Sequence, residues 1–231
     1  MIDKTFLENV ILDENDEKNA EIFLRSKGFV KHSLIKNYLL SRSDTNTVEY
    51  TAIATTYRYD KRVRNILFKY ISYLEEFYRG KILDLYYYNT DQTFWTSKVK
   101  YWLGKYENDL DRALEKIEFS ELINQIKKIK ELSSEVFPKI PHLNDNLSAL
   151  IDLRNAVMHN KLLILFNDYK ICFDENGLDS ATLTSNIKNL VAFLPSGPKE
   201  KCIKEINDCA IDRNENNDTK WNLPQFVVVK I

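Results

Sequence analysis

One short segment of the chain carries residue types that could act on a phosphodiester. It reads RNAVMH and covers residues 154–159. The guanidinium of Arg154 is permanently charged and can bind a phosphate through two parallel N–H bonds. The imidazole of His159 can accept or donate a proton. Together they are a minimal set for cleaving a phosphodiester whose nucleophile is an adjacent hydroxyl, which RNA supplies as its 2′-OH.

The spacing of these residues leaves two interpretations open. Asn155 and His159 are four residues apart and share a helix face. Arg154 and His159 are five apart, which places them about 140° from each other around a helix. They converge only if the helix loosens near His159 or if Arg154 reaches around it. From spacing alone, the commoner arrangement is a cap or surface pair in which His159 complements the helix dipole.

Four further residues are candidates for supporting this site or binding its substrate. Asn160 and Lys161 directly follow the motif, and Lys161 could hold a phosphate or complement the helix end. Glu75 and Arg79 form an acid-before-base pair at i,i+4, which can support the site or only stabilise its own helix. A similar pair, Asp60 and Arg64, is predicted to be structural.

Helices are predicted to position these residues. Apolar residues recur every three or four positions over 57–88, and a second helix is expected to run from Asn144 or Asp145 to about residue 158. Other helices are predicted at 16–28, 31–42, 93–117, 119–133, 182–194 and from Pro198 to about 210, whereas 45–56 is ambiguous. The segment 226–231 is predicted to be a terminal strand or an extended tail.

Two sequence patterns resemble those of a known family. The segment 154–159 resembles the R-x4–6-H motif of the HEPN superfamily. The segments YRYDKRVR (57–64) and LEEFYR (74–79) resemble the "Y-x-F-D-x-x-L-R … I-E-x-x-x-R" pattern of Abi-like abortive-infection proteins. They occur in the expected order, and the resemblance covers roughly residues 20–170.

The resemblance implies an all-α, HEPN-like helical bundle that forms homodimers and cleaves RNA without a metal or other cofactor. Arg154 would bind the scissile phosphate, His159 would transfer protons, and Asn155 would orient them in a cleft shared by two copies. The products would be a 2′,3′-cyclic phosphate (or a 3′-phosphate) and a 5′-hydroxyl. The biological role would be antiphage defence or a toxin, held in check by an antitoxin or an inhibitory RNA or protein.

The chain departs from these patterns at two positions. Tyr59 stands where the Abi-like pattern commonly has Phe. Lys161 stands where HEPN toxins silenced by adenylylation have Tyr, so regulation by a nucleotidyltransferase is less expected here.

The composition limits the classes of protein to which the chain can belong. The chain has 231 residues, 33 Lys+Arg and 34 Asp+Glu, for a net charge of −1. This balance excludes a uniformly basic protein that coats nucleic acid, but it allows a local basic site. Only five Gly and five Pro favour a mainly α domain over a turn-rich β fold. We expect one domain over 1–231, with a small C-terminal appendage from about 177 as an alternative.

The cysteines and apolar runs indicate a cytoplasmic protein. The three cysteines form no CxxC pair, which disfavours a disulfide framework and predicts small buried side chains. No metal-ligand spacing, signal peptide or membrane-spanning run is expected. The alternative to an RNase is a non-catalytic helical dimer that binds RNA or protein, while a metal-dependent hydrolase is disfavoured.

Overall fold

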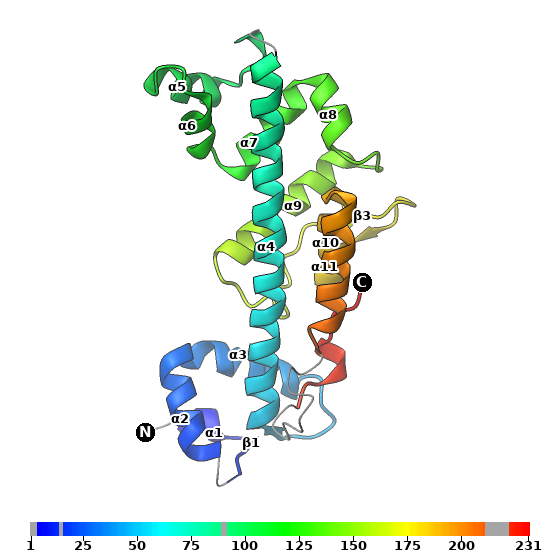
Figure 1. The fold of residues 1–231 in the computed structure, drawn as a ribbon. Coiled ribbons are helices and arrows are strands. Elements are labelled where there is room, and N and C mark those ends of the chain that lie inside the picture. Colours follow the sequence, from blue (N-terminus) through cyan, green and yellow to red (C-terminus); the bar gives the residue numbers. More distant parts are fainter. Residues whose placement is uncertain (1–3, 14–15, 89–91, 211–221) are drawn as a thin grey trace.

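A single long helix organises the molecule. The computed structural model describes residues 4–13, 16–88, 92–210 and 222–231. Helix α4 (Tyr50–Tyr88) has 39 residues and runs along most of the length of the molecule (Figure 1). At 1.5 Å per residue it is about 58 Å long. It begins before the predicted residue 57 because Ala52 and Ile53 are buried against the N-terminal helices, which outweighs the strand propensity of this segment.

The N-terminal elements surround the first turns of α4. They are α1 (Lys4–Leu7), α2 (Asp16–Lys27) and α3 (Phe29–Leu40), which build a smaller apolar core with α4. Gly28, with a φ of 93°, separates α2 from α3, which confirms the predicted helix end. Strand β1 (Val10–Ile11) pairs in parallel with β2 (Val48–Glu49), with Val10 opposite Val48.

The main core lies between α4 and the helices that follow it. Around α4 pack α7 (Phe119–Lys128), α9 (Leu143–Met158), α10 (Leu183–Phe193) and α11 (Ser196–Asp208). The predicted stripe of α4 is buried there: Val63, Leu67, Tyr70, Ile71, Leu74, Tyr78 and Ile82. At the far end of α4 lie η1 (Gln92–Phe94), α5 (Ser97–Lys105) and α6 (Leu110–Glu115) (Figure 1). The fold of the described residues is therefore mainly helical, and none of these helices combines the length and apolar character needed to cross a membrane.

Several element boundaries differ from the prediction. The helix expected at 119–133 is divided into α7 and α8 (Lys130–Val136), because Ile129 takes an extended conformation. Helix α9 begins at Leu143 after a left-handed His142, so neither Asn144 nor Asp145 caps it. Helix α11 begins at Ser196, two residues before Pro198.

The C-terminal segment belongs to the main core. Helices α10 and α11 contribute buried residues to the same apolar cluster as α4 and α9. Among its described residues, the segment holds one short strand, β4 (Asp179–Ser180), which pairs antiparallel with β3 (Cys172–Phe173).

The alternative of a terminal strand at 226–231 is wrong. After η2 (Gln225–Val227) the tail is extended, but it pairs with side chains instead of a strand. The N–H of Val229 donates to the hydroxyl of Tyr59 over 2.7 Å, and the side chain of Asn207 pairs with the backbone of Ile231. These side chains satisfy the backbone groups that a neighbouring strand would otherwise bond.

Candidate functional site

The predicted motif lies at the carboxyl end of α9. His159 caps the helix, and Asn160 takes a left-handed conformation with a φ of 52°. The N–H of Asn160 donates to the carbonyl of Val157 over 3.1 Å, and the N–H of Lys161 to that of Ala156 over 3.0 Å. This pair of bonds is the Schellman ending of a helix, in which Asn can replace Gly at the left-handed position. Asn160 therefore ends the helix, a role that its residue type alone did not reveal.

Arg154 is held by an acid of the long helix. Its Nε donates to Oε1 of Glu75 over 2.9 Å, and its Nη1 lies 3.5 Å from Oδ1 of Asn155. The Glu75 side chain is 12% exposed, and its second oxygen lies 3.7 Å from Nη2 of Arg79. The structure thus brings these four predicted residues together. Among the described residues, Nη2 of Arg154 has no hydrogen-bond partner, so it is open to a ligand.

The imidazole of His159 is separate from this group. Its side chain is exposed and makes no hydrogen bond or ion pair with the residues that the structure describes. Helix α9 stays regular up to the preceding residue, and Arg154 is tied to Glu75. Within one chain of the described residues, Arg154 and His159 therefore share no hydrogen bond.

A buried ion pair fixes the loop that follows the motif. Nη2 of Arg64 lies 2.7 Å from Oδ2 of Asp60, with side-chain exposures of 8% and 1%. Nη1 of Arg64 donates to Oδ1 of Asn160 over 3.1 Å, and Oδ1 of Asp60 accepts from the N–H of Ile164 over 3.1 Å. Burial raises the pKa of Asp60, against the opposing effects of the Ile164 N–H and Arg64.

Asp60 and Arg64, which the sequence pattern predicts to be structural, also contact the motif and its loop, which the pattern did not indicate. One signal was available in the spacing. Arg64 and Glu75 are eleven residues apart and therefore on nearly the same face of α4. Both contact the end of α9, Glu75 at Arg154 and Arg64 at Asn160.

Two lysines border the loop. The Nζ of Lys161 lies 4.3 Å from the ring centroid of Phe166, and the residue is exposed. The Nζ of Lys31, on α3, donates to the carbonyl oxygen of Asn160 over 3.0 Å. The sequence carried no signal for Lys31, because the contact spans 129 positions.

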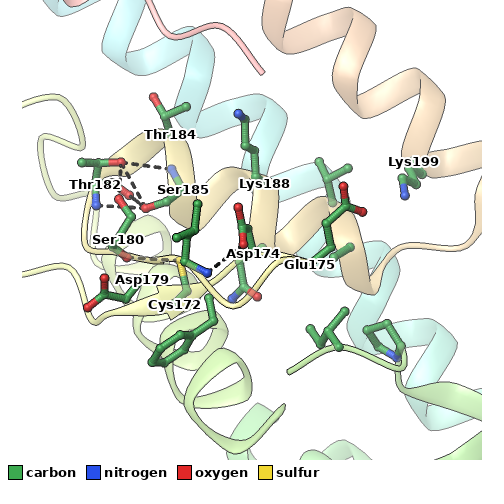
Figure 2. Close-up of a pocket in the computed structure, with 17 residues that line it drawn as sticks. Cys172, Asp174, Glu175, Asp179, Ser180, Thr182, Thr184, Ser185, Lys188 and Lys199 are labelled. Carbon is green, nitrogen blue, oxygen red and sulfur yellow. Dashed lines mark hydrogen bonds between the residues drawn. The ribbon is translucent and has the colours of Figure 1, made fainter. Parts of the chain in front are cut away.

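A pocket of about 630 Å³ lies elsewhere, between β3–β4 and α10 (Figure 2). None of the predicted site residues lines it. Some of its polar groups serve local structure: Thr182 and Ser185 cap α10 reciprocally, and Asp174 accepts from two backbone N–H groups of its own turn.

The chain's cysteines fit the prediction of small buried side chains. Cys172, Cys202 and Cys209 are free and buried, and burial raises the pKa of Cys209 to about 11. Among the described residues, no three His, Cys, Asp or Glu side chains gather in a way that could hold a metal ion.

Comparisons of the chain with protein-family models, with curated proteins and with solved structures find no match.

Proposed function

We propose that this protein is a metal-independent endoribonuclease of the HEPN type, which cleaves RNA in a site formed by two copies of the chain. The observation that carries the proposal is the placement of Arg154. Glu75 orients its guanidinium through Nε, which leaves Nη2 for a phosphate, while His159 stands exposed at the end of the same helix. The resemblance of 154–159 to the R-x4–6-H motif supplies the reaction class.

In the proposed reaction the 2′-oxygen bonds to the adjacent phosphorus while the bond from phosphorus to the 5′-oxygen breaks. One imidazole takes the proton of the 2′-OH, and another gives a proton to the leaving 5′-oxygen. The products are a 2′,3′-cyclic phosphate and a 5′-hydroxyl. Arg154 stabilises the negative charge that builds on the phosphate oxygens. Each chain carries one His159, so two copies supply both proton transfers.

Exposed apolar side chains near the motif favour the pairing of two chains. Val30 and Leu34 of α3 are 68% and 51% exposed, and they flank Lys31, which contacts the motif loop. Phe68, 51% exposed, lies on α4 between Arg64 and Glu75. We propose that these side chains contribute to the homodimer. The proposed setting is the cytoplasm, where an antiphage RNase or toxin would meet RNA and any antitoxin.

The test is incubation of the purified protein with total RNA in EDTA. The wild type is expected to cleave RNA, and His159→Ala to lower the rate by at least about 100-fold, the usual contribution of a general acid or base. His142→Asn is the matched control. It removes the exposed histidine at the opposite end of α9, and Asn suits both the left-handed conformation and the cap position. Absence of cleavage, or undiminished cleavage by His159→Ala, contradicts the proposal.

A second candidate function is a non-catalytic dimer that binds RNA or protein. The specific observation in its favour is that the charge of Arg154 is already paired with Glu75. This alternative predicts salt-sensitive retention of RNA without cleavage, unchanged by His159→Ala and weakened by Arg154→Ala.

A further inference from the structure

Cationic side chains gather beside the motif, on α2, α3 and the first half of α4. Lys31 touches the motif loop through the carbonyl oxygen of Asn160. Lys27 precedes it by four residues and ends α2. Arg58 and Lys61 lie on α4, two turns and one turn before Arg64, whose guanidinium holds the side chain of Asn160. Lys31 therefore joins this group to the motif directly, and the contact of Arg64 places the part of α4 that carries Arg58 and Lys61 next to the motif loop.

The cations are close enough to act on one another. The pKa of Lys27 is lowered, first by burial and then by repulsion from Arg58 and Lys61. Neither Arg58 nor Lys61 forms an ion pair with any residue in the described ranges, and Lys61 is exposed. Like charges held together in this way cost folding free energy, and a local basic cluster is the electrostatic footprint of a surface that binds a polyanion.

We propose that Lys27, Lys31, Arg58 and Lys61, here called the cationic strip, bind the phosphate backbone of single-stranded RNA and lead it to Arg154. This inference rests on the proposed function and adds where the substrate lies beyond its scissile phosphate. It also explains how a chain with a net charge of −1 can hold RNA.

The distance from the strip to Arg154 sets the length of RNA that can contact both. From Arg58 to Glu75, the residue that holds Arg154, the chain advances 17 positions. Along an α-helix this is about 25 Å. A dinucleotide can reach only one end of that distance, whereas a longer strand can contact the strip and the motif at once. A single strand fits better than a duplex because its nucleotides can be splayed out for attack by the 2′-OH.

The test compares a labelled, unstructured RNA of roughly 20 nucleotides, longer than typical single-strand site sizes, with a dinucleotide. The variants are Arg58→Gln/Lys61→Gln and, as a charge reversal at one exposed position, Lys61→Glu. Lys201→Gln is the control, because Lys201 is an exposed lysine on α11, outside the strip. Binding is measured in the His159→Ala background over a range of salt concentrations, and circular dichroism melts verify folding.

The affinity for RNA falls as the salt concentration rises, and the loss of two phosphate contacts is expected to make this slope of log K against log salt less steep by about 1.4. If the variant and its parent bind equally at 1 M salt, the variant binds up to about 60-fold more weakly at 50 mM salt. The ratio of kcat/KM for the long RNA to that for the dinucleotide falls accordingly. If the strip variants bind the long RNA as tightly as Lys201→Gln does, the role proposed for the strip is overturned, whereas the proposed nuclease activity is not. Strip-dependent binding without any cleavage supports the strip and overturns the nuclease. No binding of the long RNA by His159→Ala, together with no cleavage by the wild type, overturns both.

Discussion

The buried ion pair of Asp60 and Arg64 provides the sharpest test of the structure. Replacing Asp60 by Asn keeps the size of the side chain and leaves an oxygen for the N–H of Ile164, but it removes the only negative charge within 4 Å of Arg64 among the described residues. Arg64 is then a buried cation without a counter-ion. Breaking a buried pair in this way typically costs about 3–5 kcal/mol of unfolding free energy.

The lower end of that range is the better expectation here. Burial raises the pKa of Asp60, which indicates that its charged form is itself partly disfavoured in the fold. A loss of about 3 kcal/mol corresponds, at a slope of about 2 kcal/mol per molar urea, to a fall of about 1.5 M in the unfolding midpoint. The loop at Asn160 should loosen as well, since Arg64 holds its side chain.

The assay is urea unfolding followed by circular dichroism, with Asp109→Asn as the control. Asp109 and Arg112 form an exposed pair at 4.0 Å, with side-chain exposures of 47% and 69%, and Asn preserves the helix cap. The control should lose at most about 0.5 kcal/mol. The double variant Asp60→Asn/Arg64→Met removes both charges and should recover much of the lost stability.

Two results would contradict this role of the ion pair. One is an Asp60→Asn midpoint no lower than that of Asp109→Asn. The other is a double variant that is no more stable than Asp60→Asn alone.

Four further predictions concern other residues of the structure. Tyr59→Phe leaves the N–H of Val229 unpaired and should cost about 1–3 kcal/mol in urea unfolding; no loss would mean that the tail is not held there. Asn160→Ala should be less stable than Asn160→Gly by about 1 kcal/mol, because only Gly avoids the left-handed penalty; equal midpoints would contradict the helix ending. Burial lowers the pKa of His32 in the folded protein below its usual 6.5. As the pH falls, the unfolded chain therefore binds the proton before the folded chain does. The stability that His32 contributes above pH 6.5 is lost as the pH falls from 6.5 through the pKa of the folded state. Wild type should therefore lose more stability than His32→Gln between pH 7 and pH 5, and equal losses would count against a buried neutral His32. Burial raises the pKa of Cys202 to about 12 and that of Cys209 to about 11, so both thiols should react with a disulfide reagent only after unfolding; rapid labelling of the native protein would contradict their burial.

The long helix shows how much local pattern could predict. The apolar stripe of α4 fixed which face is buried, since residues spaced by three and four positions share one side of a helix. The same rule placed Asp60, Arg64, Glu75 and Arg79 on related faces. It could not place the start of the helix, because residues 50–56 have strand propensity and become helical only by packing on the N-terminal helices.

The candidate site also combines features that local spacing predicts with contacts that depend on distant segments. Residue spacing alone placed Arg154, Asn155 and His159 near the end of one helix and left open whether Arg154 and His159 meet. The tertiary structure decided that Arg154 binds Glu75, 79 positions away, and that Arg64 and Lys31 converge on Asn160 from two other helices. It also decided that the tail at 226–231 bonds to Tyr59 and Asn207 instead of forming a strand. The physical reason is the range of the interactions: helix periodicity is set by neighbouring residues, whereas a buried polar group takes whichever partner the packing of distant segments brings within hydrogen-bonding distance.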